Sequence, residues 1–239
     1  METSNPLLKR ETAWSTAAAD GSTMTLEGAV NKSGILLLIC LATACVSWRS
    51  PELQGPFVLA GALGGLIVCM IGLFKPATTP VTAPLYAALE GLALGAIAQI
   101  SNVRYPGIAA NAFLLTMAVL GVMLFLYATR IIVVTQKVVM GIVIATGAIF
   151  VVYLAEFILR FFGITLAYLH DSSPIGIGIS LVIVGVAAFN LLLDFSVIEG
   201  NVRARAPKYM EWYGGMALLV TLVWLYLEIL RLLSKLRDR

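Results

Sequence analysis

The chain has 239 residues, of which 60% are hydrophobic and only 12% are charged, and its formal net charge is +3. Soluble domains carry about 25% charged residues, so this composition excludes an ordinary soluble protein. No basic stretch with interleaved aromatic residues is present, so we expect no nucleic-acid partner.

The first 32 residues are polar and rich in Ala, Ser and Thr. No apolar stretch precedes Ile35, so this segment lacks the hydrophobic region of a signal peptide. We predict a flexible polar tail over residues 1–32 and a single transmembrane domain over residues 33–239. A short interfacial turn is expected at Thr25–Glu27, just ahead of the first helix.

Seven apolar segments follow, and most have the roughly 20 residues that a helix needs to cross a bilayer. They cover residues 33–48, 57–74, 81–101, 108–128, 138–159, 175–197 and 213–233. In lipid every unpaired backbone group costs several kcal/mol, so such runs are helices rather than strands. We therefore predict an all-α membrane protein built as a bundle of seven transmembrane helices.

Small residues recur at four-residue spacing in three of these segments and predict close approach between helices. They are Gly61 and Gly65, then Ala87, Gly91 and Gly95, then Gly141 and Ala145.

Lysine and arginine in the loops predict the orientation of the chain. The side that includes the N-terminus carries Lys9, Arg10, Lys32, Lys75, Arg130, Lys137, Arg203, Arg205 and Lys208, against Arg49, Arg104 and Arg160 opposite. We therefore expect a cytoplasmic N-terminus. Counting spans then puts the basic residues Arg231, Lys235, Arg237 and Arg239 outside, and the sequence leaves the side of the C-terminus open.

Three carboxylic acids inside the apolar segments are candidate functional residues, because acids in a membrane are costly unless protonated, paired or hydrated. Glu90 lies in the middle of the third segment, either as a functional group or as a protonated acid with one interhelical hydrogen bond. Asp194 closes the sixth segment and shares a polar stripe with Asn190, one turn earlier, unless it is simply interfacial. Glu228 is the acid of the last segment, and Arg231 is spaced to neutralise it at a helix end.

A fourth acid, Glu156, precedes Arg160 by four residues, which is the spacing of a structural ion pair on one helix face. We predict no catalysis. The one histidine, His170, lies between segments, no Ser/His pair lies within the membrane, and no span has an aspartyl-protease motif or a metal-ligand cluster. Cys40, Cys45 and Cys69 are expected to behave as small apolar residues.

Five sequence motifs, taken in order, resemble the Bax inhibitor-1 (YccA-like) family, and in particular a bacterial branch. They are Met24–Thr25–Leu26–Glu27–Gly28, Leu85–Tyr86–Ala87–Ala88–Leu89–Glu90–Gly91, Gly176–Ile177–Gly178, Leu193–Asp194–Phe195 and Leu225–Tyr226–Leu227–Glu228. The resemblance covers the chain from about Met24 to its end.

This resemblance implies a seven-helix bundle with the last helix at its centre, in the inner membrane of a bacterium. It also implies a pH-sensitive calcium or cation leak channel without a cofactor, in which Ca²⁺ is the permeant ion. By the family pattern, Asp194 and Glu228 would form the gate and bind Ca²⁺ transiently. Lys75 would stand where the family places a basic latch for the acid of the sixth helix.

A carboxylate pair suits such a gate because two buried acids cannot both ionise cheaply. Sharing one proton, they would hold two helices together, and once both are ionised they would separate and offer oxygen ligands to Ca²⁺. Span counting puts Glu228 far along its helix from Asp194. The pair therefore requires the last helix to begin well before Tyr213 or to break near Gly214–Gly215.

The alternative function is a membrane scaffold that binds a protease or another membrane protein. In that case the acids serve only packing.

Overall fold

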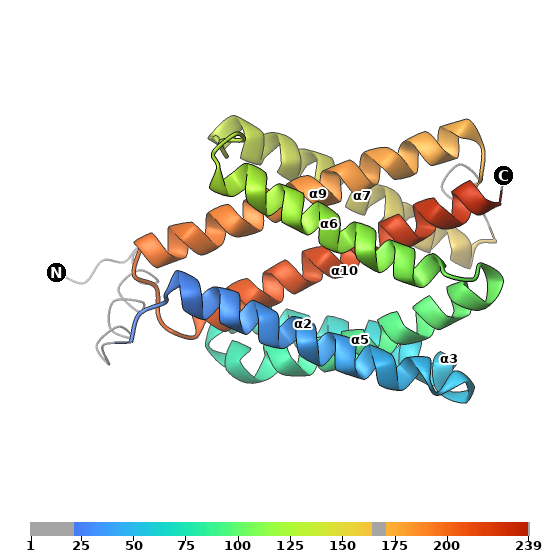
Figure 1. Ribbon diagram of the computed structural model, residues 1–239, viewed down its shortest axis with the longest axis horizontal. Helices are drawn as coiled ribbons and strands as arrows, with labels where there is room; N and C mark the ends of the chain where they lie inside the picture. The colour runs from blue at the N-terminus through green and yellow to red at the C-terminus, as the bar shows by residue number, and fades with distance from the viewer. Residues whose placement is uncertain (1–21, 164–170, 239) are drawn as a thin grey trace. The chain divides into compact units, whose positions relative to one another are not determined.

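The computed structural model describes residues 22–163 and 171–238 and shows helices joined by short connections (Figure 1). The elements are α2 (Leu26–Trp48), η2 (Pro51–Leu53), α3 (Gln54–Leu59), η3 (Ala60–Gly65), α4 (Leu66–Phe74), η4 (Pro76–Thr78), α5 (Thr79–Arg104), α6 (Ile108–Ala128), α7 (Gln136–Phe161), α9 (Pro174–Arg203) and α10 (Met210–Arg237). Among the described residues, seven helical segments are long and apolar enough to cross a membrane. The predicted all-α, seven-span class is confirmed. His170 lies outside the described residues.

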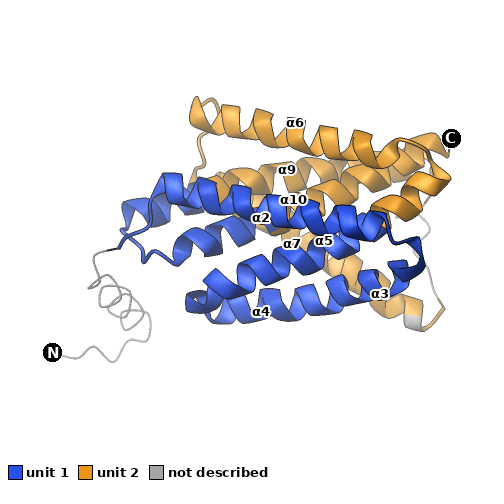
Figure 2. Cartoon of the chain, turned by 60° about the horizontal axis from the view of Figure 1, so that its bottom comes forward, with its two compact units in different colours: residues 1–96, 196–219 blue, residues 97–195, 220–239 orange. Residues whose placement is uncertain are grey.

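The chain divides into two compact units (Figure 2). Unit 1 comprises Met1–Ala96 and Ser196–Leu219, and unit 2 comprises Ile97–Phe195 and Val220–Arg239. Three helices, α5, α9 and α10, contribute residues to both units.

The first helix begins earlier than the sequence predicts. The Thr25 side chain accepts a hydrogen bond from the Gly28 backbone N–H at 3.0 Å, and Glu27 lies in the first turn. Both features stabilise a helix N-terminus, so α2 starts at Leu26 instead of near Ser33. Residues 26–32, predicted as part of the tail, are therefore helical, and residues 1–21 lie outside the described part of the chain.

Glycines bring the helices of unit 1 together as predicted. A Cβ atom on Gly91 or Gly95 would collide with the backbone of α2, at Cys40 and Ala44 respectively. A Cβ on Gly61 would likewise collide with α5, at Ala93 and Leu89. By contrast, no atom lies within 4 Å of the same position on Gly141, so that glycine mediates no close approach.

The second span contains an unusual turn. Its central segment η3 is a π-helix with the sequence AGALGG, set between α3 and α4. A π-helical turn is rare and commonly marks a functional position within a helix.

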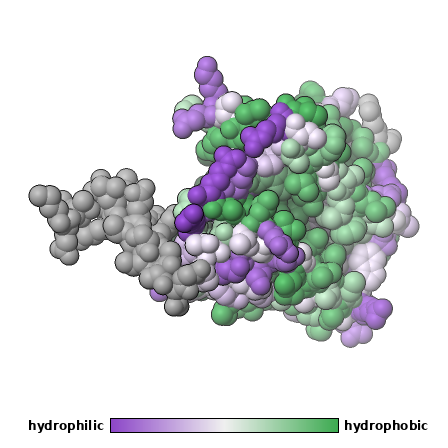
Figure 3. Space-filling model, turned by 60° about the vertical axis from the view of Figure 1, so that its left-hand side comes forward, coloured by the Kyte–Doolittle hydropathy of each residue, from purple (hydrophilic) through white to green (hydrophobic). Residues whose placement is uncertain are grey.

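Large apolar side chains remain exposed on the spans, as expected of a protein whose solvent is lipid. Examples are Leu38, Leu63, Phe125, Phe150 and Leu181. Figure 3 shows hydrophobic residues over large parts of one face, with hydrophilic residues in narrower bands. In the most apolar window of α7 only 6% of the residues are buried, whereas in α5 and α10 half are. The last helix is thus one of the two most buried spans.

The last two spans are longer than predicted. Helix α9 continues to Arg203, and α10 begins at Met210. Helix α10 also passes through Gly214 and Gly215 without a break. The bounds of α9 and α10 determine how far apart Asp194 and Glu228 lie along their helices.

Candidate functional site: the buried acids of the last two spans

Asp194 lies on α9 and has one hydrogen-bond partner among the described residues. The Thr221 hydroxyl, from α10, donates a hydrogen bond to its carboxylate. The other carboxylate oxygen, Oδ2, is buried and has no hydrogen-bond partner. Buried polar atoms are nearly always paired, so an orphaned carboxylate oxygen indicates a place for a proton, a water molecule or an ion.

Glu228 lies in a different, saturated network. Its side chain is 2% exposed and accepts hydrogen bonds from Arg231 Nη1 at 3.0 and 3.1 Å and from the Tyr153 hydroxyl at 2.8 Å. Arg231 Nη1 also donates to the Tyr153 oxygen at 2.5 Å. The network joins α7 to α10. It contains the ion pair between Glu228 and Arg231 that their spacing predicted, as the alternative to a pair of Glu228 with Asp194.

The two acids are therefore not brought together in this conformation. Thr221 faces Asp194, and it precedes Glu228 by seven residues, or about 10 Å along a helix with a 1.5 Å rise. An unbroken α10 cannot shorten this separation. The carboxylate pair expected between Asp194 and Glu228 stays a prediction for another state.

The auxiliary residues differ in their surroundings. Asn190 Nδ2 donates to the Thr146 hydroxyl on α7 and to the Val186 carbonyl, both at 2.8 Å. Lys75 ends α4 and is exposed, and no ion pair among the described residues includes it. The predicted structural pair of Glu156 and Arg160 is confirmed at 3.4 Å.

Glu90 lies in the middle of α5 and is half-buried. A Cβ atom on Gly65 of η3 would stand 2.7 Å from its Oε2 atom. The interhelical hydrogen bond expected of a protonated Glu90 is not present among the described residues.

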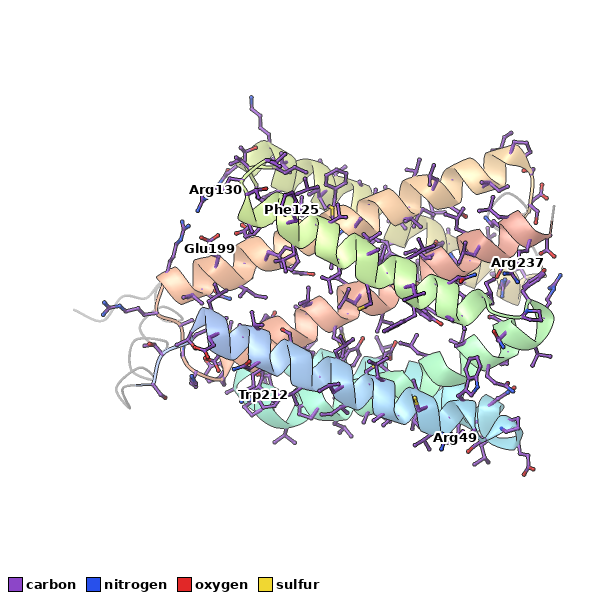
Figure 4. The ribbon with its side chains drawn as sticks, in the orientation of Figure 1. Arg49, Phe125, Arg130, Glu199, Trp212 and Arg237 are labelled. Atoms are coloured by element: carbon purple, nitrogen blue, oxygen red, sulfur yellow. The ribbon has the colours of Figure 1, made fainter. Side chains whose placement is uncertain are left out.

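A further buried acid, Glu211, was overlooked by the sequence analysis. Its carboxylate accepts hydrogen bonds from the backbone N–H and the hydroxyl of Thr25, both at 3.0 Å, and pairs with Lys208 at 2.9 Å. Next to it, Lys32 Nζ on α2 lies 4.7 Å from the ring centroid of Trp212 on α10. Trp212 is labelled in Figure 4. These contacts join the beginnings of α2 and α10 within unit 1.

Sequence reasoning also missed Thr221 and Tyr153, the uncharged partners of the two acids. Thr221 offered a weak signal: seven residues are close to two helical turns, so it shares a helix face with Glu228. Nothing in the sequence linked Tyr153 to Glu228, which lies 75 residues later.

No group of three or more His, Cys, Asp or Glu side chains in the described ranges could hold a metal ion.

Comparison with models of known protein families gives a match. The family model described as Bax inhibitor 1 like matches residues 5–238. Neither curated proteins nor solved structures give a significant match. Since the matched region includes nearly the whole chain and all seven spans, the protein belongs to the Bax inhibitor-1-like family.

Proposed function

We propose that the protein is a pH-sensitive cation leak channel, with Ca²⁺ as a permeant ion and Asp194 as the group that senses pH. The observation that carries this proposal is the buried Asp194 oxygen without a partner, beside Thr221. Family membership supports the general class of membrane protein. We further propose that it has no enzymatic activity and acts in a bacterial inner membrane with its N-terminus in the cytoplasm.

The chemistry of Asp194 supports a gate in which protonation closes the path. A neutral acid in an apolar span is tolerated, and the Thr221 hydroxyl then bridges α9 and α10. Loss of the proton leaves a charge in a low-dielectric site, which is stabilised only by water or a cation. A carboxylate is also the hard oxygen ligand that Ca²⁺ prefers. Leak should therefore increase as the pH rises.

In this proposal Glu228 has a different role from the one that the family pattern implies. Its hydrogen-bonding capacity is directed to Arg231 and Tyr153, so it holds α10 against α7. The closing contact of the gate is then the one between Asp194 and Thr221. A proton-sharing pair with Glu228 would require the Arg231 network to break first.

Ca²⁺ flux into liposomes that contain the purified full-length protein tests the proposal. We expect flux to rise with pH between roughly 6 and 8, because buried carboxylates titrate in this range. Asp194→Asn should flatten the curve. The matched control Glu52→Gln, at an exposed acid in η2, should leave it unchanged. Flux that is absent at every pH would instead favour the membrane scaffold.

A further inference from the structure

We propose that Glu90 is a second proton-binding site in the membrane, separate from Asp194, and that loss of its proton loosens the contact between η3 and α5. The site lies entirely in unit 1 and does not depend on the proposed channel activity.

The first observation is the lack of any compensating group at Glu90. Its carboxyl makes no hydrogen bond or ion pair among the described residues. It nevertheless lies near the midpoint of a 26-residue span, where an isolated charge costs several kcal/mol. Glu228 and Glu211, by contrast, each have a basic partner and hydroxyl donors. A proton is the ligand that makes an unpaired acid tolerable at this depth.

The second observation is the close packing around the carboxyl. The glycines of the π-helical turn face α5, with Gly61 against Ala93, Gly64 against Leu89 and Gly65 against Glu90. No side chain therefore separates the Glu90 oxygens from the backbone of η3. On α5 the next residue, Gly91, contacts the backbone of α2. On the side that faces η3, a carboxylate formed here has no room for water unless η3 moves away.

The third observation concerns the neighbouring titratable groups. They are Cys40 on α2, Cys69 on α4 and Tyr86, one turn earlier on α5. Thiols and phenols ordinarily stay neutral at pH 7, so none of them supplies a counter-charge. Cys69 lies four residues after Gly65, one turn along the same span, and is a natural reporter of movement in this segment.

Labelling with dicyclohexylcarbodiimide tests proton binding directly. This apolar reagent reacts with protonated carboxyls: the acid oxygen adds to the carbodiimide carbon while the acid proton moves to a reagent nitrogen. The adduct then rearranges to a stable N-acylurea without loss of atoms. In vesicles that contain the full-length protein, peptide mass spectrometry should find Glu90 modified at roughly pH 6 and several-fold less at roughly pH 9.

Glu228 is the internal reference, because its ion pair with Arg231 requires a carboxylate. We expect it to stay unmodified in the same sample. Labelling of Glu90 should also be unchanged in Asp194→Asn, which shows that the two sites are separate. Absence of label on Glu90 at roughly pH 6, or label that disappears in Asp194→Asn, would overturn the proposal.

Maleimide labelling of Cys69 tests the coupled movement. Raising the pH should increase the rate at Cys69 several-fold more in the natural protein than in Glu90→Gln, which cannot ionise. The exposed Cys45 is the control and should respond equally in both proteins. Equal responses of Cys69 in the two proteins would refute the loosening.

Discussion

Asp194 on α9 and Glu228 on α10 differ in the hydrogen bonds that their carboxylate oxygens accept. The Glu228 carboxylate accepts three hydrogen bonds from two side chains, whereas one oxygen of Asp194 accepts none. Satisfied buried charges are structural more often than responsive, because any change leaves a partner unpaired. This contrast assigns anchoring to Glu228 and titration to Asp194.

Replacing Glu228 with Gln should therefore destabilise the protein while preserving the pH dependence of flux. Removing one member of a fully buried ion pair costs about 3–5 kcal/mol, and the loss should be smaller here because the Arg231 side chain is 37% exposed. Arg231→Ala should have a comparable effect. Thermal unfolding in detergent measures the loss of stability, and the liposome flux assay measures the pH dependence. Stability effects of Glu228→Gln and Asp194→Asn should add within about 0.5 kcal/mol, and a larger coupling would mean that the acids meet.

Thr221 provides a finer test of the Asp194 site. Thr221→Val removes the hydroxyl that joins Asp194 to α10 in the closed state, so the channel should open more readily and the flux curve should move toward lower pH. A hydrogen bond between neutral groups contributes about 0.5–1.5 kcal/mol, which corresponds to a shift of roughly one pH unit or less. Thr221→Ser retains the donor and should shift the curve little. If the flux curve of Thr221→Val coincides with that of the natural protein, the Thr221 hydroxyl has no part in gating.

At the scale of elements, glycine spacing predicted contacts only in part. Gly91 and Gly95 meet α2 as expected, whereas Gly141, with the same spacing to a small residue, faces open space. The difference has a physical cause: spacing defines a helix face, but only the arrangement of the other helices determines whether that face meets a helix or lipid. The π-helical turn of η3 was equally invisible, because its AGALGG sequence is also compatible with an ordinary transmembrane helix.

Paired glycine substitutions on α2 test the contact between the beginnings of α2 and α10. A Cβ atom on Gly28 would overlap the Glu211 carboxylate, whereas one on Gly34 meets nothing within 4 Å. Gly28→Ala should therefore destabilise the protein by about 1–3 kcal/mol through strain and lost hydrogen bonds. Gly34→Ala should be neutral or slightly stabilising, since alanine favours a helix. Thermal unfolding of both variants measures the difference in stability. Equal melting temperatures would contradict the close contact between Gly28 and Glu211.

For the molecule as a whole, the number and class of the spans could be predicted because bilayer thickness imposes a length on each apolar run. The candidate acids were also found from sequence, since a charge in a span is conspicuous. The uncharged partners Thr221 and Tyr153 were not found, because they reach the acids through tertiary packing, whereas Arg231 was predicted from its spacing to Glu228. Helix ends were misplaced where a helix extends beyond its apolar run, as at Leu26, which follows the Thr25 cap, and at Met210.

The orientation of the chain is a prediction at this scale. Single cysteines at Ser50 and Thr129, in a background without Cys40, Cys45 and Cys69, follow the first and fourth spans. With a cytoplasmic N-terminus, an impermeant maleimide added outside intact cells should label Ser50→Cys and spare Thr129→Cys. The reverse pattern would invert the topology, and labelling of both would contradict the span count.

The Glu211 contact also affects the order in which the protein can assemble during synthesis. Thr25 and Glu211 are separated by 186 positions, and the first span leaves the ribosome long before the last one exists. Until α10 is inserted, the backbone N–H of Thr25 lacks its carboxylate partner. The N-terminus of α2 is then stabilised by the Thr25 cap and by contacts with helices that were inserted before α10. Insertion and folding are therefore distinct steps here: the first helix crosses the bilayer early, and its N-terminus is secured only when the chain is nearly complete.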